Sequence, residues 1–110
     1  MDIKTFTDDL LQALSEANIF TSVSVQSEGP TIDGHAWIEE NTFLRIYYNA
    51  ATGTQAFALI RNNQRFWGID YDNFRGWHEH PVSNPAKHIT IEPITVKEII
   101  HRNPYSPENI

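Results

Sequence analysis

The chain of 110 residues contains no cysteine. Disulfides, thiolate metal sites and a cysteine nucleophile are therefore excluded, and with them the disulfide-stapled secreted scaffold and the zinc ribbon. Long apolar runs are also missing, because no segment reaches the roughly 18 residues of a membrane span and the acidic N-terminal segment does not resemble a signal peptide. We therefore expect a cytoplasmic protein that does not bind a membrane.

Basic residues are few, with 8 Lys and Arg against 14 Asp and Glu and a net charge of −6. This balance argues against binding duplex DNA, because such binding neutralises many phosphates with Lys and Arg. Three arginines lie between residues 45 and 67, a segment without acidic residues, and we expect Arg45, Arg61 and Arg65 to form one positive patch. Hydrophobic residues make up 40% of the chain, which predicts a packed core and a single domain over residues 1–110.

Apolar residues at three- and four-residue spacing predict a helix over residues 5–18, capped by Thr5 and stopped at Asn18. The period then changes to two, and Asp33-Gly34 is interpreted as part of a loop that starts near residue 28. Asn62-Asn63 predicts a tight hairpin with Leu59 opposite Phe66. Strands are predicted over residues 20–26, 35–39, 42–48, 55–61 and 64–71.

Five of the six prolines lie in the last 30 residues, so we expect residues 72–93 to be mostly loop, with a short strand at 88–91. Thr95 and Glu98 predict a capping box at the start of a helix over residues 96–102, followed by a frayed tail at 105–110. The predicted fold is α+β: a curved antiparallel sheet of about five strands, with the N-terminal helix on one face and the loop and short C-terminal helix at one edge.

Three of the five histidines, His78, His80 and His88, lie close together in the sequence. In an extended segment His78 and His80 point to the same side, about 7 Å apart. They could bind one metal ion as neutral imidazoles, with Asp70 or Asp72 as a fourth ligand or as a hydrogen-bond acceptor. The spacing is unspecific, and histidines that only hydrogen-bond a proline-rich loop would fit it equally well.

A second interpretation is RNA cleavage without a metal. One histidine would act as general base on a ribose 2′-OH, another histidine or a tyrosine would act as general acid on the leaving 5′-oxygen, and arginines would stabilise the phosphate charge. Aromatic side chains between these groups could stack on unpaired bases, although most should lie in the core. The aromatic candidates are Tyr47, Trp67, Tyr71, Phe74 and Trp77, and the arginine candidates are Arg45, Arg65 and Arg75.

Asp70 and Asp72 share one strand face and could form a paired-carboxylate site, but an Asp-x-Asp sequence at a strand end is more typical of a turn cap. His101 lies at the C-terminal end of the predicted second helix, where the helix dipole favours a cation.

Three segments are informative together: the runs at residues 43–49 and 66–70, and above all Asp72-Asn73-Phe74-Arg75-Gly76-Trp77-His78-Glu79-His80-Pro81 with His88. They resemble the TumE-like toxins of bacterial and archaeal toxin–antitoxin modules. The resemblance covers about residues 42–100. It differs from the commonest version of that family, which has adjacent histidines and a more basic C-terminal part. The resemblance implies a growth-inhibiting toxin, encoded beside a DNA-binding antitoxin, with RNA as its target. The matching positions are Asp72, Asn73, His78, His80 and His88.

Together these observations predict a TumE-like toxin that acts as a metal-independent endoribonuclease without a cofactor. Its expected partners are the cognate antitoxin and single-stranded RNA, and the chain is compatible with a monomer or a homodimer. A non-catalytic protein-interaction module, with an exposed apolar patch and no pocket at the histidines, and a His-ligated metal protein are the alternatives. The candidate catalytic residues are His78, His80, His88, Asp72 and Asn73, and the candidate substrate-binding residues are Arg45, Arg65, Arg75, Tyr47 and Trp77.

Overall fold

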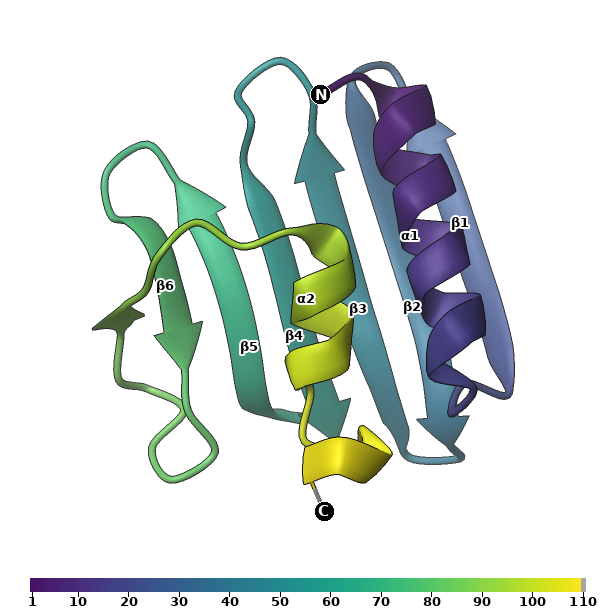
Figure 1. The fold of residues 1–110 in the computed structure, drawn as a ribbon, viewed down its shortest axis with the longest axis vertical. Coiled ribbons are helices and arrows are strands. Elements are labelled where there is room, and N and C mark those ends of the chain that lie inside the picture. Colours follow the sequence, from purple (N-terminus) through teal and green to yellow (C-terminus); the bar gives the residue numbers. More distant parts are fainter. Residues whose placement is uncertain (110) are drawn as a thin grey trace.

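The computed structural model describes residues 1–109, which form an α+β fold with a seven-stranded antiparallel sheet (Figure 1). The strand order in the sheet follows the chain from β1 to β7, because each strand turns back beside the one before it. The predicted fold class is confirmed, with seven strands instead of about five. The elements are α1 (Ile3–Ala17), β1 (Ser22–Glu28), β2 (Thr31–Glu39), β3 (Thr42–Asn49), β4 (Gln55–Arg61), β5 (Gln64–Asp72), β6 (Gly76–His80), β7 (Ile89–Thr90), α2 (Val96–Arg102) and a 3₁₀ turn at Pro107–Asn109.

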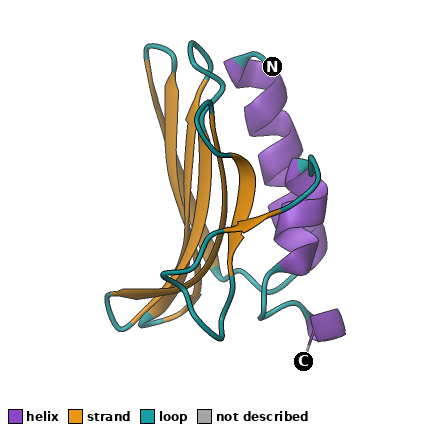
Figure 2. Ribbon diagram, turned by 90° about the vertical axis from the view of Figure 1, so that its left-hand side faces the viewer, coloured by secondary structure: helices purple, strands orange, loops and turns teal. Residues whose placement is uncertain are grey.

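Both helices lie on the same face of the sheet, and within residues 1–109 the other face carries no helix (Figure 2). The core lies between the helices and the sheet, where the ring of Phe6 in α1 stacks on that of Tyr48 in β3 with 4.2 Å between the ring centres. Helix α2 packs beside α1 over the middle strands, so the expectation that it lies at one edge was wrong (Figure 1). The fully buried side chains include Leu10, Ile46, Phe57, Leu59, Ile69 and Ile99.

Helix α1 begins earlier than predicted, because its N-cap is Asp2 and not Thr5. The Asp2 carboxylate accepts a hydrogen bond from the backbone N–H of Thr5 at 2.7 Å, and a negative charge there complements the helix dipole. Asn18 ends the helix in the left-handed conformation, with φ 55°, as predicted. The capping box of α2 is also confirmed, because the Thr95 hydroxyl accepts from the Glu98 N–H while the Glu98 carboxylate accepts from the Thr95 N–H.

The hairpin at Asn62-Asn63 is confirmed, with φ angles of 51° and 65°. Its register differs from the prediction, since Leu59 pairs with Trp67 and not with Phe66. A bulge after Leu59 inserts one extra residue into β5, which shifts every later pair by one position.

Residues 28–34 are not one loop. Gly29, with φ 56°, makes the turn, and β2 begins at Thr31, so Asp33 and Gly34 lie inside a nine-residue strand. Gly34 pairs with Val25 on one side and with Ile46 on the other.

Residues 72–93 contain a strand that the sequence pattern did not predict. β6 pairs with β5 from Gly76 opposite Asp72 to His80 opposite Gly68. The polar sequence of β6, with a glutamate between two histidines, lacks the apolar alternation of a half-buried strand. The tail also differs from the expected frayed segment, because Tyr105 packs on Phe66 with 6.0 Å between ring centres; Ile110 lies outside the described residues.

No helix within residues 1–109 is long and apolar enough to cross a membrane.

Candidate functional site: a histidine cluster on the helix-free face

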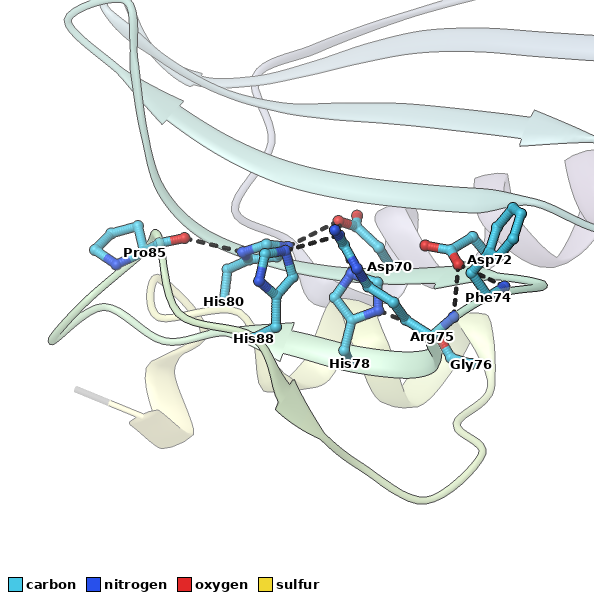
Figure 3. A network of polar contacts seen from close by, with 9 residues as sticks. All are labelled: Asp70, Asp72, Phe74, Arg75, Gly76, His78, His80, Pro85 and His88. Atoms are coloured by element: carbon cyan, nitrogen blue, oxygen red, sulfur yellow. Dashed lines mark hydrogen bonds and ion pairs between the residues drawn. The ribbon is translucent and has the colours of Figure 1, made fainter.

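His78, His80 and His88 lie together beside β5 and are called the histidine cluster below (Figure 3). The first two come from β6, and His88 comes from the connection to β7. Their ring centres are 4.5–5.2 Å apart, and one nitrogen of each ring lies within 4.8 Å of the others. The prediction that His78 and His80 share one side of an extended segment is confirmed.

Asp70 contacts two of the three rings, those of His78 and His80. Its Oδ2 atom is 3.0 Å from Nε2 of His80 and 3.5 Å from Nε2 of His78. The antiparallel register places Asp70 directly opposite His78, so the carboxylate and both rings lie on the helix-free face. One carboxylate oxygen therefore lies next to the Nε2 atoms of two imidazoles, whose side chains are only 3% and 2% exposed.

The second nitrogen of each buried ring is held by the backbone. Nδ1 of His78 lies 3.1 Å from the carbonyl oxygen of Gly76, and Nδ1 of His80 lies 2.9 Å from that of Pro85. A carbonyl oxygen only accepts hydrogen bonds, so both Nδ1 atoms donate. These bonds fix the two rings with their Nε2 atoms directed at Asp70.

His88 is the exposed member of the cluster and has a different partner. The guanidinium of Arg75 donates to Nε2 of His88 at 2.9 Å, and because a guanidinium only donates, this ring nitrogen accepts. Desolvation and the positive charge of Arg75, followed by those of the other two rings and of Arg65, hold the pKa of His88 below its ordinary value of 6.5. The neutral form of His88 is therefore favoured.

Asp72 and Asn73 shape the turn between β5 and β6 and do not join the cluster. Oδ1 of Asp72 accepts from the backbone N–H groups of Phe74 and Arg75 at 2.9 and 2.8 Å, and the bond from Arg75 is the main cause of the lowered pKa of Asp72. The amide of Asn73 donates to the carbonyl of Thr52, away from the histidines. This turn presents Phe74 to solvent with its side chain fully exposed.

The arginine candidates lie in three different surroundings. Arg75 touches the cluster, and Arg65 extends over Gly68, where its Cδ atom would lie 3.7 Å from an added Cβ. Arg45 pairs with Asp33 at 3.6 Å, two strands away from β5. Arg61 pairs with Thr42, which is three residues from Arg45 in β3, so Arg61 and Arg45 point to opposite faces of the sheet. The prediction that Arg45, Arg61 and Arg65 form one patch was therefore wrong.

The two aromatic candidates for substrate binding lie on different faces of the sheet, because Tyr47 is in line with Asp70 across Ala56 whereas Trp77 is not. Trp77 precedes His78 in the strand and so points to the helix-bearing face, where it packs on Tyr71 with 5.2 Å between ring centres. Tyr47 is half-buried on β3, and its hydroxyl accepts from the amide of Asn49 at 3.4 Å. Strand alternation explains the placement of Trp77.

A polar network on the helix-bearing face was not predicted. Glu79, between the two histidines of β6, accepts from the indole N–H of Trp67 at 2.9 Å and from the guanidinium of Arg102 at 2.8 Å. β6 therefore has a glutamate that connects it to α2 on one face and two histidines on the other.

Comparisons of the chain with protein-family models, with curated proteins and with solved structures found no match. A function for the protein therefore has to be argued from the chemistry of its site. The cluster combines groups that transfer protons, guanidinium groups that bind anions and imidazole nitrogens that bind metals.

Proposed function

We propose that the protein is a TumE-like toxin of the cytoplasm that cleaves single-stranded RNA without a metal, using the histidine cluster for acid–base catalysis. The observation that carries the proposal is the meeting of three imidazoles, one carboxylate and the Arg75 guanidinium at one point of the helix-free face. The resemblance of residues 42–100 to that toxin family supports the same function.

His88 suits the general base, because it is exposed and its pKa is lowered, so its Nε2 is free of a proton near neutral pH. In the free protein this nitrogen accepts from Arg75. A phosphodiester bound at the cluster would draw the guanidinium onto a non-bridging oxygen, which leaves Nε2 of His88 able to take the proton of the 2′-hydroxyl.

His78 suits the general acid. Its Nδ1 donates to a carbonyl, and its Nε2 faces the Asp70 carboxylate at 3.5 Å, longer than the 3.0 Å of His80. In the reaction the 2′-oxygen attacks phosphorus, the bond from phosphorus to the 5′-oxygen breaks, and the proton on Nε2 of His78 passes to the leaving oxygen. The products are a 2′,3′-cyclic phosphate and a 5′-hydroxyl.

The test is cleavage of single-stranded RNA by the untagged protein in EDTA, with analysis of the new ends. Loss of a general base typically costs 10²–10⁴-fold, so we expect His88→Gln to lower the rate by at least about 100-fold. His101→Gln is the matched control, because His101 is paired with Glu108 at 3.0 Å next to the C-terminal turn and outside the cluster. Equal rates for the wild type and His88→Gln, or no cleavage in EDTA, would overturn the proposal.

The proposed function includes an antitoxin as the partner. Expression of the chain alone should arrest growth, and co-expression of the neighbouring reading frame should relieve the arrest. Arrest that persists unchanged in the His88→Gln variant would separate any toxicity from the histidine cluster.

A further inference from the structure

We propose that the histidine cluster and the Asp70 carboxylate form a binding site for one first-row transition-metal dication such as Zn²⁺, and that the bound ion blocks RNA cleavage. The metal site stands on its own observations, whereas the block rests on the proposed function.

Hydrogen bonds orient the two buried rings toward Asp70. Because both Nδ1 atoms donate to backbone carbonyls, both Nε2 atoms face the same oxygen of Asp70, at 3.0 and 3.5 Å. Two imidazole nitrogens and one carboxylate oxygen therefore converge on the same point, an arrangement of donor atoms that suits one metal ion (Figure 3).

A single metal ion would bind there through nitrogen atoms of two largely buried side chains, which are only 3% and 2% exposed. The Nδ1 bonds are also the arrangement that orients metal-binding histidines, because they fix the ring and leave Nε2 as the ligand atom.

The donor set selects the class of metal. Imidazole nitrogens suit Zn²⁺, Cu²⁺, Ni²⁺ and Fe²⁺, whereas Mg²⁺ and Ca²⁺ prefer oxygen. The three ligand nitrogens now lie within 4.8 Å of one another. Tetrahedral bonds of ~2.1 Å would draw them to separations of roughly 3.4 Å. His88 can move toward the buried rings because it is exposed, as are most residues of the segment before it.

Arg75 competes with a metal for the same site. Its guanidinium donates to Nε2 of His88 at 2.9 Å, so it has to leave before this nitrogen can bind an ion. Its positive charge would also repel the ion. Removal of Arg75 should therefore strengthen metal binding, although the same change should weaken RNA cleavage. These opposite effects distinguish the two proposals.

The experiment is a titration of the untagged full-length chain with Co²⁺, followed by its visible absorption, and with Zn²⁺, followed by calorimetry. We expect one ion per chain and the intense absorption bands of four-coordinate Co²⁺. His88→Gln should lower the affinity at least about tenfold. Arg75→Gln should raise it severalfold, and His101→Gln should leave it unchanged. Far-UV circular dichroism checks that each variant is folded.

Three results would overturn the metal site: no saturable binding, an affinity that His88→Gln leaves unchanged, or an affinity that Arg75→Gln lowers. If the wild type binds Co²⁺ and cleaves no RNA, the proposed function fails and the metal site stands. If it cleaves RNA in EDTA and binds no Co²⁺, the metal site fails alone. If it binds Zn²⁺ and cleaves RNA equally fast with and without the ion, the proposed block is wrong.

Discussion

Two glycines inside strands should respond to the same substitution with opposite signs. Neither Gly34 nor Gly68 has a left-handed backbone, so alanine is conformationally allowed at both. At such positions Gly→Ala usually stabilises a protein by about 0.4–1 kcal/mol, because it restricts the unfolded chain. At Gly68, however, an added Cβ would lie 2.8 Å from the backbone oxygen of Phe57, whereas at Gly34 the nearest atom, the backbone oxygen of Ser24, is 3.4 Å away.

The contact at Gly68 cannot be relieved by a side-chain rotation, because the Phe57 oxygen belongs to the neighbouring strand β4. Overpacking of this kind costs about 1–3 kcal/mol. We therefore expect Gly68→Ala to lower the free energy of unfolding by about 1–2 kcal/mol, and Gly34→Ala to leave it unchanged or raise it by up to about 1 kcal/mol.

Urea unfolding of the wild type and both variants, followed by circular dichroism, measures this difference. Thermal unfolding should agree, with Tm lowered by about 4 °C or more for each kcal/mol lost in a domain of this size. Gly68 also pairs with His80, so strand separation there should weaken Co²⁺ binding as well. A Gly68→Ala variant as stable as Gly34→Ala would refute the reasoning, because it would mean that β4 and β5 separate at no cost.

Three further substitutions test the core, a helix cap and the exposed aromatic. Leu10→Ala removes a fully buried side chain and should lower the free energy of unfolding by about 2–5 kcal/mol in urea. The pKa of Glu98 is held below its ordinary value of 4.5 mainly by the hydrogen bond from the Thr95 N–H. The charge of Glu98 therefore stabilises the protein above about pH 4.5, and this contribution is lost as the pH falls through the lower folded pKa. Across that range the difference in Tm between the wild type and Glu98→Gln should shrink. Phe74→Ala changes a fully exposed side chain and should alter the free energy of unfolding by less than about 0.5 kcal/mol. If RNA stacks on this ring, the same variant should bind single-stranded RNA more weakly in a fluorescence titration.

Local chemistry was enough to predict the elements with strong sequence patterns. The capping box of α2, the helix stop at Asn18 and the Asn62-Asn63 hairpin each depend on a few neighbouring residues, and all three are confirmed. The bulge after Leu59 and the strand β6 were missed. Both depend on pairing with a neighbouring strand and leave little trace in the local sequence.

The same limit applies to the candidate site. Strand alternation was enough to predict that His78 and His80 share a side. Asp70 and Asp72 were equal candidates for a metal ligand or a hydrogen-bond acceptor beside the histidines, because the place of Asp70 opposite His78 follows from the register of a hairpin that was not predicted. Trp77 was placed at the site although the same alternation turns it to the other face, where it packs on Tyr71. The signal that could have placed Asp70 is the Asp72–Arg75 turn, which fixes the pairing of the two strands.

The two-sided strand β6 also limits how the chain can change in length. Its histidines lie on one face and Glu79 on the other, and a shift of pairing by one residue exchanges the two faces. An insertion of one residue in the Asn73–Arg75 turn that shifted this pairing would bring Glu79 to the position of the imidazoles and turn the imidazoles toward Arg102. The length of this turn is therefore as strict a requirement for the site as the identity of its histidines.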